Sequence, residues 1–147
     1  RSYTERDGWG YRSYGHCSPS LCGEVGMAFT ITNILNDLGS LHCVQTDATS
    51  TVDVLKASSG RLYKIEIDNS ANDAPSYVRL WDSTGSITVG STGPNWVFKC
   101  PASVLRSFSC PAGSIFSAGL KAACVTTAGT AGNTNPTNDV IYRIQLS

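Results

Sequence analysis

The sequence is poor in charge. Lysine, arginine, aspartate and glutamate make up 15% of its 147 residues, and 11 basic residues balance 11 acidic ones. A globular domain usually carries about a quarter charged residues. Binding to nucleic acid or to anionic lipid depends largely on clustered lysine and arginine. The balance therefore argues against a nucleic-acid partner and against a membrane partner.

Long apolar runs are missing as well. No stretch approaches the roughly 20 apolar residues that cross a bilayer, although 41% of the chain is hydrophobic. Instead, 19 serines, 14 threonines and 14 glycines make up 47 of the residues. This composition predicts one soluble all-β domain with many turns, large enough to bury a core without disulfide support.

Signatures of catalysis are also lacking. The G-x-S-x-G, H-E-x-x-H, G-x-G-x-x-G and P-loop motifs do not occur. A glycosidase site needs two carboxylates, and the glutamates that could serve are limited to Glu5, Glu24 and Glu66. We therefore predict that the protein is not an enzyme and uses no cofactor.

Two groups of residues resemble metal sites, and both have a simpler interpretation. His16, Cys17 and Cys22 with His42-Cys43 could supply zinc ligands, but adjacent residues of an extended chain point to opposite faces, which separates His42 from Cys43. The loop 68–73 carries oxygen-bearing side chains that calcium favours, yet it lacks the glycine and the distal glutamate of an EF-hand. Asn and Asp are common in plain turns, so no metal is predicted.

Six cysteines permit pairing without requiring it. Cys17 and Cys22 flank Ser-Pro-Ser-Leu, where Pro19 favours a turn that could bring the two sulfurs within bridging range. The remaining four are interpreted as buried small apolar residues, namely Cys43, Cys100, Cys110 and Cys124. A hairpin turn at residues 101–103 would place Cys110 opposite the region of Asn95, out of reach of Cys100.

The first 27 residues differ from the rest of the chain. Aromatic residues alternate there with arginines and glycines, without helical or strand periodicity. Trp, Tyr and Arg are the residue types that anchor protein interfaces, so an extended arm with partner contacts is predicted, against the alternative that it folds back on its own domain. The predicted contact residues are Tyr3, Trp9, Tyr11, Arg12 and Tyr14.

Between the arm and the rest of the chain, two structures compete. Ile31, Ile34, Leu35 and Leu38 follow helical spacing, and Gly39 is placed to end a helix. Thr30 and Thr32 are β-branched, which favours a strand. The expected organisation is an arm with one short helix in residues 1–39 and a β-sandwich domain in residues 40–147.

Beyond Ser40 the apolar period changes to two. In Arg61 to Asp68, Tyr63, Ile65 and Ile67 are expected on one face, with the polar residues and Leu62 on the other. Further strands are predicted at 51–55, 77–82, 86–89, 96–100, 104–110, 115–118, 120–126 and 139–146. Closely spaced strands without helices predict an antiparallel β-sandwich or barrel, most simply a jelly roll.

Three aromatic residues, Tyr77, Trp81 and Trp96, could form a platform on which sugars stack. Tyr77 and Trp81 share one strand face by period two. Aromatic side chains fill sandwich cores more often than they form such platforms, and packing is the favoured interpretation.

Several phrases of the sequence resemble small β-rich virion proteins of tailed bacteriophages, including cyanophages. The resemblance covers residues 40–147 and rests on the order of strands and turn phrases in Leu62-Tyr-Lys-Ile-Glu-Ile-Asp-Asn-Ser-Ala-Asn72, Tyr77-Val-Arg-Leu-Trp-Asp82, Gly90–Pro101 and Ala123–Gly132. It implies a structural role in the particle, most plausibly as a capsid cement or decoration protein. No binding residue carries over from it.

This resemblance implies a location on the capsid surface of the virion, after synthesis in the host bacterial cytoplasm. The implied partners are the major capsid protein and further copies of the chain, as a homotrimer whose arms clamp neighbouring capsid subunits. A different class of function competes with this one, namely a tail-fibre or tail-tip adhesin domain that binds host glycan.

Overall fold

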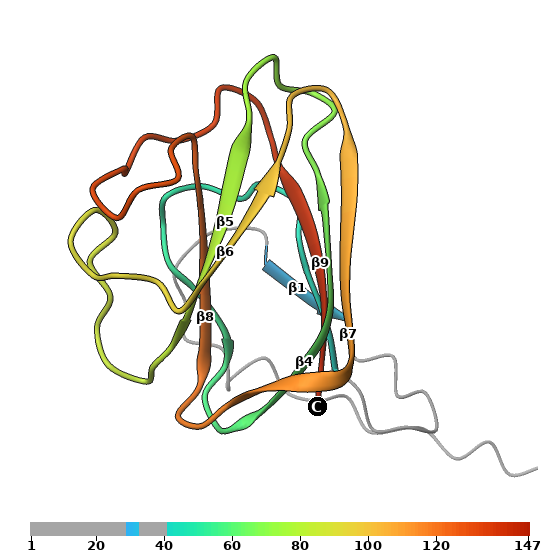
Figure 1. Ribbon diagram of the computed structural model, residues 1–147, viewed down its shortest axis with the longest axis vertical. Coiled ribbons are helices and arrows are strands. Elements are labelled where there is room, and N and C mark those ends of the chain that lie inside the picture. Colours follow the sequence, from blue (N-terminus) through green and yellow to red (C-terminus); the bar gives the residue numbers. More distant parts are fainter. Residues whose placement is uncertain (1–28, 33–40) are drawn as a thin grey trace, which may run out of the picture.

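The computed structural model describes residues 29–32 and 41–147, and this part of the chain contains strands and no helix (Figure 1). The strands are β1 (Phe29–Thr32), β2 (Leu41–Gln45), β3 (Asp53–Lys56), β4 (Gly60–Asp68), β5 (Ser76–Asp82), β6 (Trp96–Cys100), β7 (Leu105–Phe116), β8 (Leu120–Val125) and β9 (Ile141–Leu146).

The strands form two antiparallel sheets that pack face to face. The five-stranded sheet has the order β1-β2-β9-β4-β7, and the four-stranded sheet has the order β3-β8-β5-β6. In Figure 1, β4, β7 and β9 lie on one side of the sandwich, and β5, β6 and β8 lie on the other.

Eight of the strands are connected like a long hairpin that has been rolled up. β2 pairs with β9, β3 with β8, β4 with β7 and β5 with β6, always antiparallel. Two further pairings, β4 with β9 and β5 with β8, join these hairpin pairs into sheets. Such nested pairing is the jelly-roll topology. The predicted jelly-roll β-sandwich is therefore confirmed.

The core lies between the two sheets, because side chains that alternate along a strand point inward from both sheets. These inward side chains are at most 2% exposed: Cys43, Ile65, Ile67, Tyr142 and Ile144 from the five-stranded sheet, and Leu55, Val78, Leu80, Cys100 and Leu120 from the four-stranded sheet. Phe98 and Phe108 close one side of the core with ring centroids 5.1 Å apart.

A bulge alters the expected face pattern of β4. The register between β4 and its neighbours shifts between Leu62 and Lys64. Leu62 is therefore buried with Ile65 and Ile67, whereas Tyr63 is only partly buried. Strict alternation placed Leu62 on the polar face, which is wrong because a bulge adds one residue to the period of two.

The centre of the outer face of the four-stranded sheet is covered by the chain itself. Arg79 and Trp81 point away from the core that Val78 and Leu80 enter, yet both are at most 1% exposed. The indole Nε1 of Trp81 donates to the carbonyl of Thr92, at 3.2 Å, and the Arg79 guanidinium donates to carbonyls in the segment 127–132. Loops 83–95 and 126–140 thus cover the centre of this face, whereas Val54 and Val97 on the edge strands β3 and β6 stay exposed.

Most predicted strands are present, with three differences. Residues 86–89 form no strand. The predicted strands at 104–110 and 115–118 are parts of the single long strand β7, and β2 was not foreseen as a separate strand. On β7, residues 110–113 stand opposite the single residue Tyr63, so the Pro-Ala-Gly phrase at 111–113 forms a bulge within the strand and no turn.

The segment before Ser40 is described only at Phe29–Thr32. There it forms β1, which pairs antiparallel with β2 at the edge of the five-stranded sheet. The strand alternative therefore holds for Ile31 and Thr32, and the remainder of the expected helix lies outside the described residues.

The cysteines correct one expectation. Cys43, Cys100 and Cys124 are buried as predicted, but Cys110 is exposed. The chain makes no hairpin after Cys100: it crosses from the four-stranded sheet to the five-stranded sheet, and Cys110 then falls in the β7 bulge. Cys17 and Cys22 lie outside the described residues.

Candidate functional site

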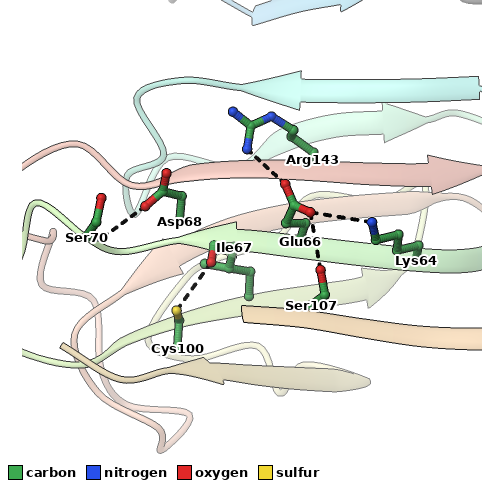
Figure 2. A network of polar contacts seen from close by, with 8 residues as sticks. All are labelled: Lys64, Glu66, Ile67, Asp68, Ser70, Cys100, Ser107 and Arg143. Carbon is green, nitrogen blue, oxygen red and sulfur yellow. Dashed lines mark hydrogen bonds and ion pairs between the residues drawn. The ribbon is translucent and has the colours of Figure 1, made fainter. Parts of the chain in front are cut away.

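The polar outer face of the five-stranded sheet is organised around Glu66 (Figure 2). One carboxylate oxygen, Oε1, accepts from Arg143 at 3.0 Å, and the other, Oε2, accepts from Lys64 at 3.4 Å and from Ser107 at 3.3 Å. Residues 66, 143 and 107 come from the neighbouring strands β4, β9 and β7. The network therefore ties three strands together.

The charge of Glu66 is balanced within this network. Burial alone would raise its pKa, but hydrogen bonding and the positive charge of Lys64, with smaller contributions from Ser107 and Arg143, lower it below the ordinary value. Glu66 therefore stays ionised and has no raised pKa of the kind that a general acid needs. We interpret these contacts as a network that holds β4, β7 and β9 together at the surface.

Edge strand β7 presents the largest exposed apolar side chains of the described residues. Leu105 is 52% exposed and Ile115 is 64% exposed. β7 lies at the end of its sheet and pairs with β4 on one side. An edge with apolar side chains is a template for contact with another protein, although Pro111 and the bulge interrupt it between the two residues.

A groove of about 550 Å³ opens at the end of the sandwich marked C in Figure 1. Its polar lining comes from the β3–β4 turn and the start of β4, and its apolar lining comes from the end of β7. Its lining includes the side chains of Lys56, Ser59, Arg61, Tyr63, Ile115 and Ser117.

Two cations stand in this groove, and local contacts hold both. Lys56 donates from Nζ to the backbone oxygen of Ser147, at 2.5 Å. Arg61 donates from Nη1 to the carbonyl of Ala112, at 2.9 Å. A Cβ on Gly113 would lie 2.9 Å from both Arg61 and Tyr63, and Gly113 has a φ of 73°. The glycine at position 113 thus allows the β7 bulge to pack closely against the side chains of Arg61 and Tyr63.

A carboxylate adjoins the groove without lining it. Asp82, at the end of β5, accepts from the backbone N–H groups of Ser117, Ala118 and Gly119 and from the Ser117 hydroxyl. Backbone hydrogen bonds from Ser117 and Ala118 lead the causes that lower its pKa to about 2. With its oxygens occupied in this way, Asp82 closes the turn between β7 and β8 and orients Ser117.

The calcium-like loop serves as a structural junction at the opposite end of the sandwich. Asn69 accepts from the Ser76 hydroxyl and donates to backbone carbonyls, including that of Pro101. Asn72 accepts from the backbone of Asn138, and Asp68 accepts from Ser70. Because these side-chain oxygens already accept hydrogen bonds, the loop behaves as the favoured turn interpretation expects.

The aromatic trio does not form an open platform. Tyr77 and Trp81 share the outer face of the four-stranded sheet, as their spacing predicted, but the loops leave Trp81 only 1% exposed. Trp96 packs instead against the core between the sheets. Packing, the interpretation favoured for these residues, accounts for Trp81 and Trp96.

The predicted contact residues of the arm, Tyr3, Trp9, Tyr11, Arg12 and Tyr14, lie outside the described residues, as do the zinc candidates His16, Cys17 and Cys22. Of the other zinc pair, Cys43 is buried toward the core and His42 is not. Within residues 29–32 and 41–147, no group of three or more His, Cys, Asp or Glu residues could hold a metal ion.

Neither the groove nor the exposed β7 side chains were foreseen from the sequence. Lys56 and Ser147 are 91 residues apart, and no local pattern brings such residues together. The only signal was Ile115 after Pro-Ala-Gly, which was interpreted as the start of a separate strand.

For the part of the chain that is described, no helix is long and apolar enough to cross a membrane. No family model matches this chain, and no curated protein matches it.

Proposed function

We propose that this chain is a non-enzymatic virion structural protein, a capsid cement or decoration protein that stabilises a phage head by clamping neighbouring capsid subunits. Its partners are the major capsid protein and further copies of itself, as a homotrimer. The observation that carries the proposal is the edge of the sandwich along β7, where Leu105 and Ile115 are more than half exposed.

The physical reason lies in what such an edge can do. An edge strand has backbone N–H and C=O groups that can pair with another chain, and apolar side chains beside them gain free energy when they leave water. Protein interfaces are built from surfaces of this kind. A protein that is held between the subunits of a capsid needs exposed contact surfaces, whereas an enzyme needs catalytic groups that converge on one site.

The fold is compatible with this role but does not carry it alone. Jelly rolls occur in viral capsid proteins, in lectins and in cupins, so the topology admits several functions. The resemblance of residues 40–147 to phage virion proteins favours the first of these classes. The aromatic and arginine-rich arm supplies a second contact region, with Tyr3, Trp9, Tyr11, Arg12 and Tyr14 as its contact residues.

The test compares two substitutions of similar size on different strands. Leu105→Lys places a charge on the β7 edge, and Val54→Lys is the matched control, because Val54 is 50% exposed on β3, at an edge of the other sheet. Binding of each full-length variant to phage heads that lack this protein is measured by co-sedimentation. We expect Leu105→Lys to weaken binding at least about tenfold, the effect typical of a central contact residue, and Val54→Lys to bind as the parent chain does.

Two results would contradict the proposal. Equal binding by both variants and the parent would exclude the β7 edge as the contact. A copy number of only a handful per purified particle would assign the chain to the tail and favour the glycan-binding adhesin. The arm is tested in the same assay with Trp9→Ala in the full chain, which should also weaken binding.

A further inference from the structure

We propose that the groove between the β3–β4 turn and the end of β7 binds the carboxylate of an acidic saccharide, with Lys56 and Arg61 as the groups that receive the charge. The groove shares Ile115 with the β7 edge proposed above as the capsid contact, whereas Lys56 and Arg61 belong to β3 and β4. The groove is open to solvent and measures about 550 Å³, which is room for one sugar unit against its wall.

The charge of the lining selects an anion. Lys56 and Arg61 are the basic side chains that line the groove, and no Asp or Glu lines it. Lys56 contacts a backbone oxygen of Ser147, and Arg61 contacts the carbonyl of Ala112. The partner of Arg61 is an uncharged carbonyl, so no anion within the groove lining pairs with this guanidinium. The Nε and Nη2 groups of Arg61 donate to no residue in the described part of the chain and can bind a carboxylate through two parallel hydrogen bonds.

The other side chains of the groove favour a sugar over a simple anion. Ser59, Tyr63 and Ser117 contribute hydroxyl groups, and a saccharide needs such partners for its own hydroxyls. The Ser117 hydroxyl donates to Asp82 at 2.9 Å, which leaves its oxygen free to accept. Ile115, 64% exposed, adds an apolar surface for the C–H groups of a sugar ring.

The test uses the full chain labelled with ¹⁵N and three probes that differ in one feature at a time. Glucuronate carries both a sugar ring and a carboxylate, glucose lacks the charge, and acetate lacks the ring. We expect glucuronate to give saturable shifts of the amide signals of residues 59–61 and 115–117. Glucose and acetate should each bind at least about tenfold more weakly.

Variants locate the site. Lys56→Gln and Arg61→Gln should each weaken glucuronate binding about tenfold. Lys99→Gln is the matched control: it removes the same charge from an exposed position on β6, outside the groove, and should change nothing. Absence of saturable shifts with glucuronate would overturn the proposal, and so would unchanged binding in both groove variants. Equal binding of acetate and glucuronate would overturn the assignment to a saccharide. The comparison of the three probes uses the parent chain alone, so it remains valid even if a variant fails to fold.

Discussion

Arg79 gives the sharpest test of how this fold is held together. Its guanidinium is fully buried on the outer face of β5, and no carboxylate of residues 29–32 or 41–147 pairs with it. Nη1 donates to the carbonyls of Thr130 and Gly132, at 3.1 and 2.7 Å, and Nη2 donates to those of Thr127 and Gly129. The nitrogen Nε has no partner among the described residues. One side chain thus gathers the carbonyls of the β8–β9 loop.

The expected loss follows from those contacts. Burial lowers the pKa of Arg79, but an arginine remains charged in a protein, so Arg79→Met removes a charged donor and leaves four carbonyls without it. Leaving a buried acceptor unsatisfied costs about 1–3 kcal/mol, and loop carbonyls can partly turn to water. Because four carbonyls lose this donor and water can replace only part of it, we expect the free energy of unfolding to fall by about 3–5 kcal/mol.

The assay is urea unfolding followed by tryptophan fluorescence. Arg143→Met is the matched control, because Arg143 lies in a central strand of the other sheet, is 44% exposed and makes one contact with Glu66. Exposed ion pairs contribute about 0–1 kcal/mol, so this variant should remain close to the parent. If Arg79→Met lost less than about 1 kcal/mol, as the control does, the carbonyl cluster would not be what holds the loop.

Three further results are expected. The pKa of Asp82 is lowered to about 2 from an ordinary 3.8, so its contribution to stability is complete above pH 4 and disappears as the pH falls through 2. Thermal unfolding should therefore show Asp82→Asn less stable than the parent at pH 5, with a smaller difference at pH 2. A difference that stays constant between the two pH values would refute this. Tyr142→Phe removes the 2.6 Å hydrogen bond from the buried phenol to Asp53 and should lower the unfolding free energy by about 1–2 kcal/mol in urea; no loss would show that the bond adds nothing. Iodoacetamide followed by peptide mass analysis should label exposed Cys110 in the native protein and Cys124 only after unfolding, because burial raises the pKa of the Cys124 thiol to about 12; rapid native labelling of Cys124 would contradict its position in the core.

The sequence was sufficient to predict the fold class, because a period of two is a local property. The alternation in β4 and the turn residues between strands indicated an antiparallel sandwich before any contact was known. Local pattern failed where extra residues enter a strand. Residues 111–113 separate the predicted strands 104–110 and 115–118, because Pro and Gly break most strands, but they lie in a bulge of the single strand β7, and the same shift reversed the side of Leu62.

The candidate site could not be predicted in this way, because it depends on contacts between distant parts of the chain. The groove joins the β3–β4 turn, the end of β7 and Ser147, and only the nested strand pairing brings these segments to one end of the sandwich. Arg79 shows the same limit. On sequence alone it is a charged residue in an apolar strand, and its carbonyl partners lie 48 to 53 residues away.

The distribution of covered and open surfaces explains why contact is proposed at one edge. Loops anchored by Arg79 and Trp81 cover the centre of the outer face of the four-stranded sheet, and on the outer face of the five-stranded sheet Glu66 already has Lys64 and Arg143 as partners. A binding partner would gain little free energy at either place, because the first is already buried and the second would lose hydration without gaining new contacts. Val54 and Val97, on the edge strands of the four-stranded sheet, are smaller and less exposed than Leu105 and Ile115. Along β7 the balance is different: Leu105 and Ile115 leave water without breaking an existing contact, so a partner gains most by binding there.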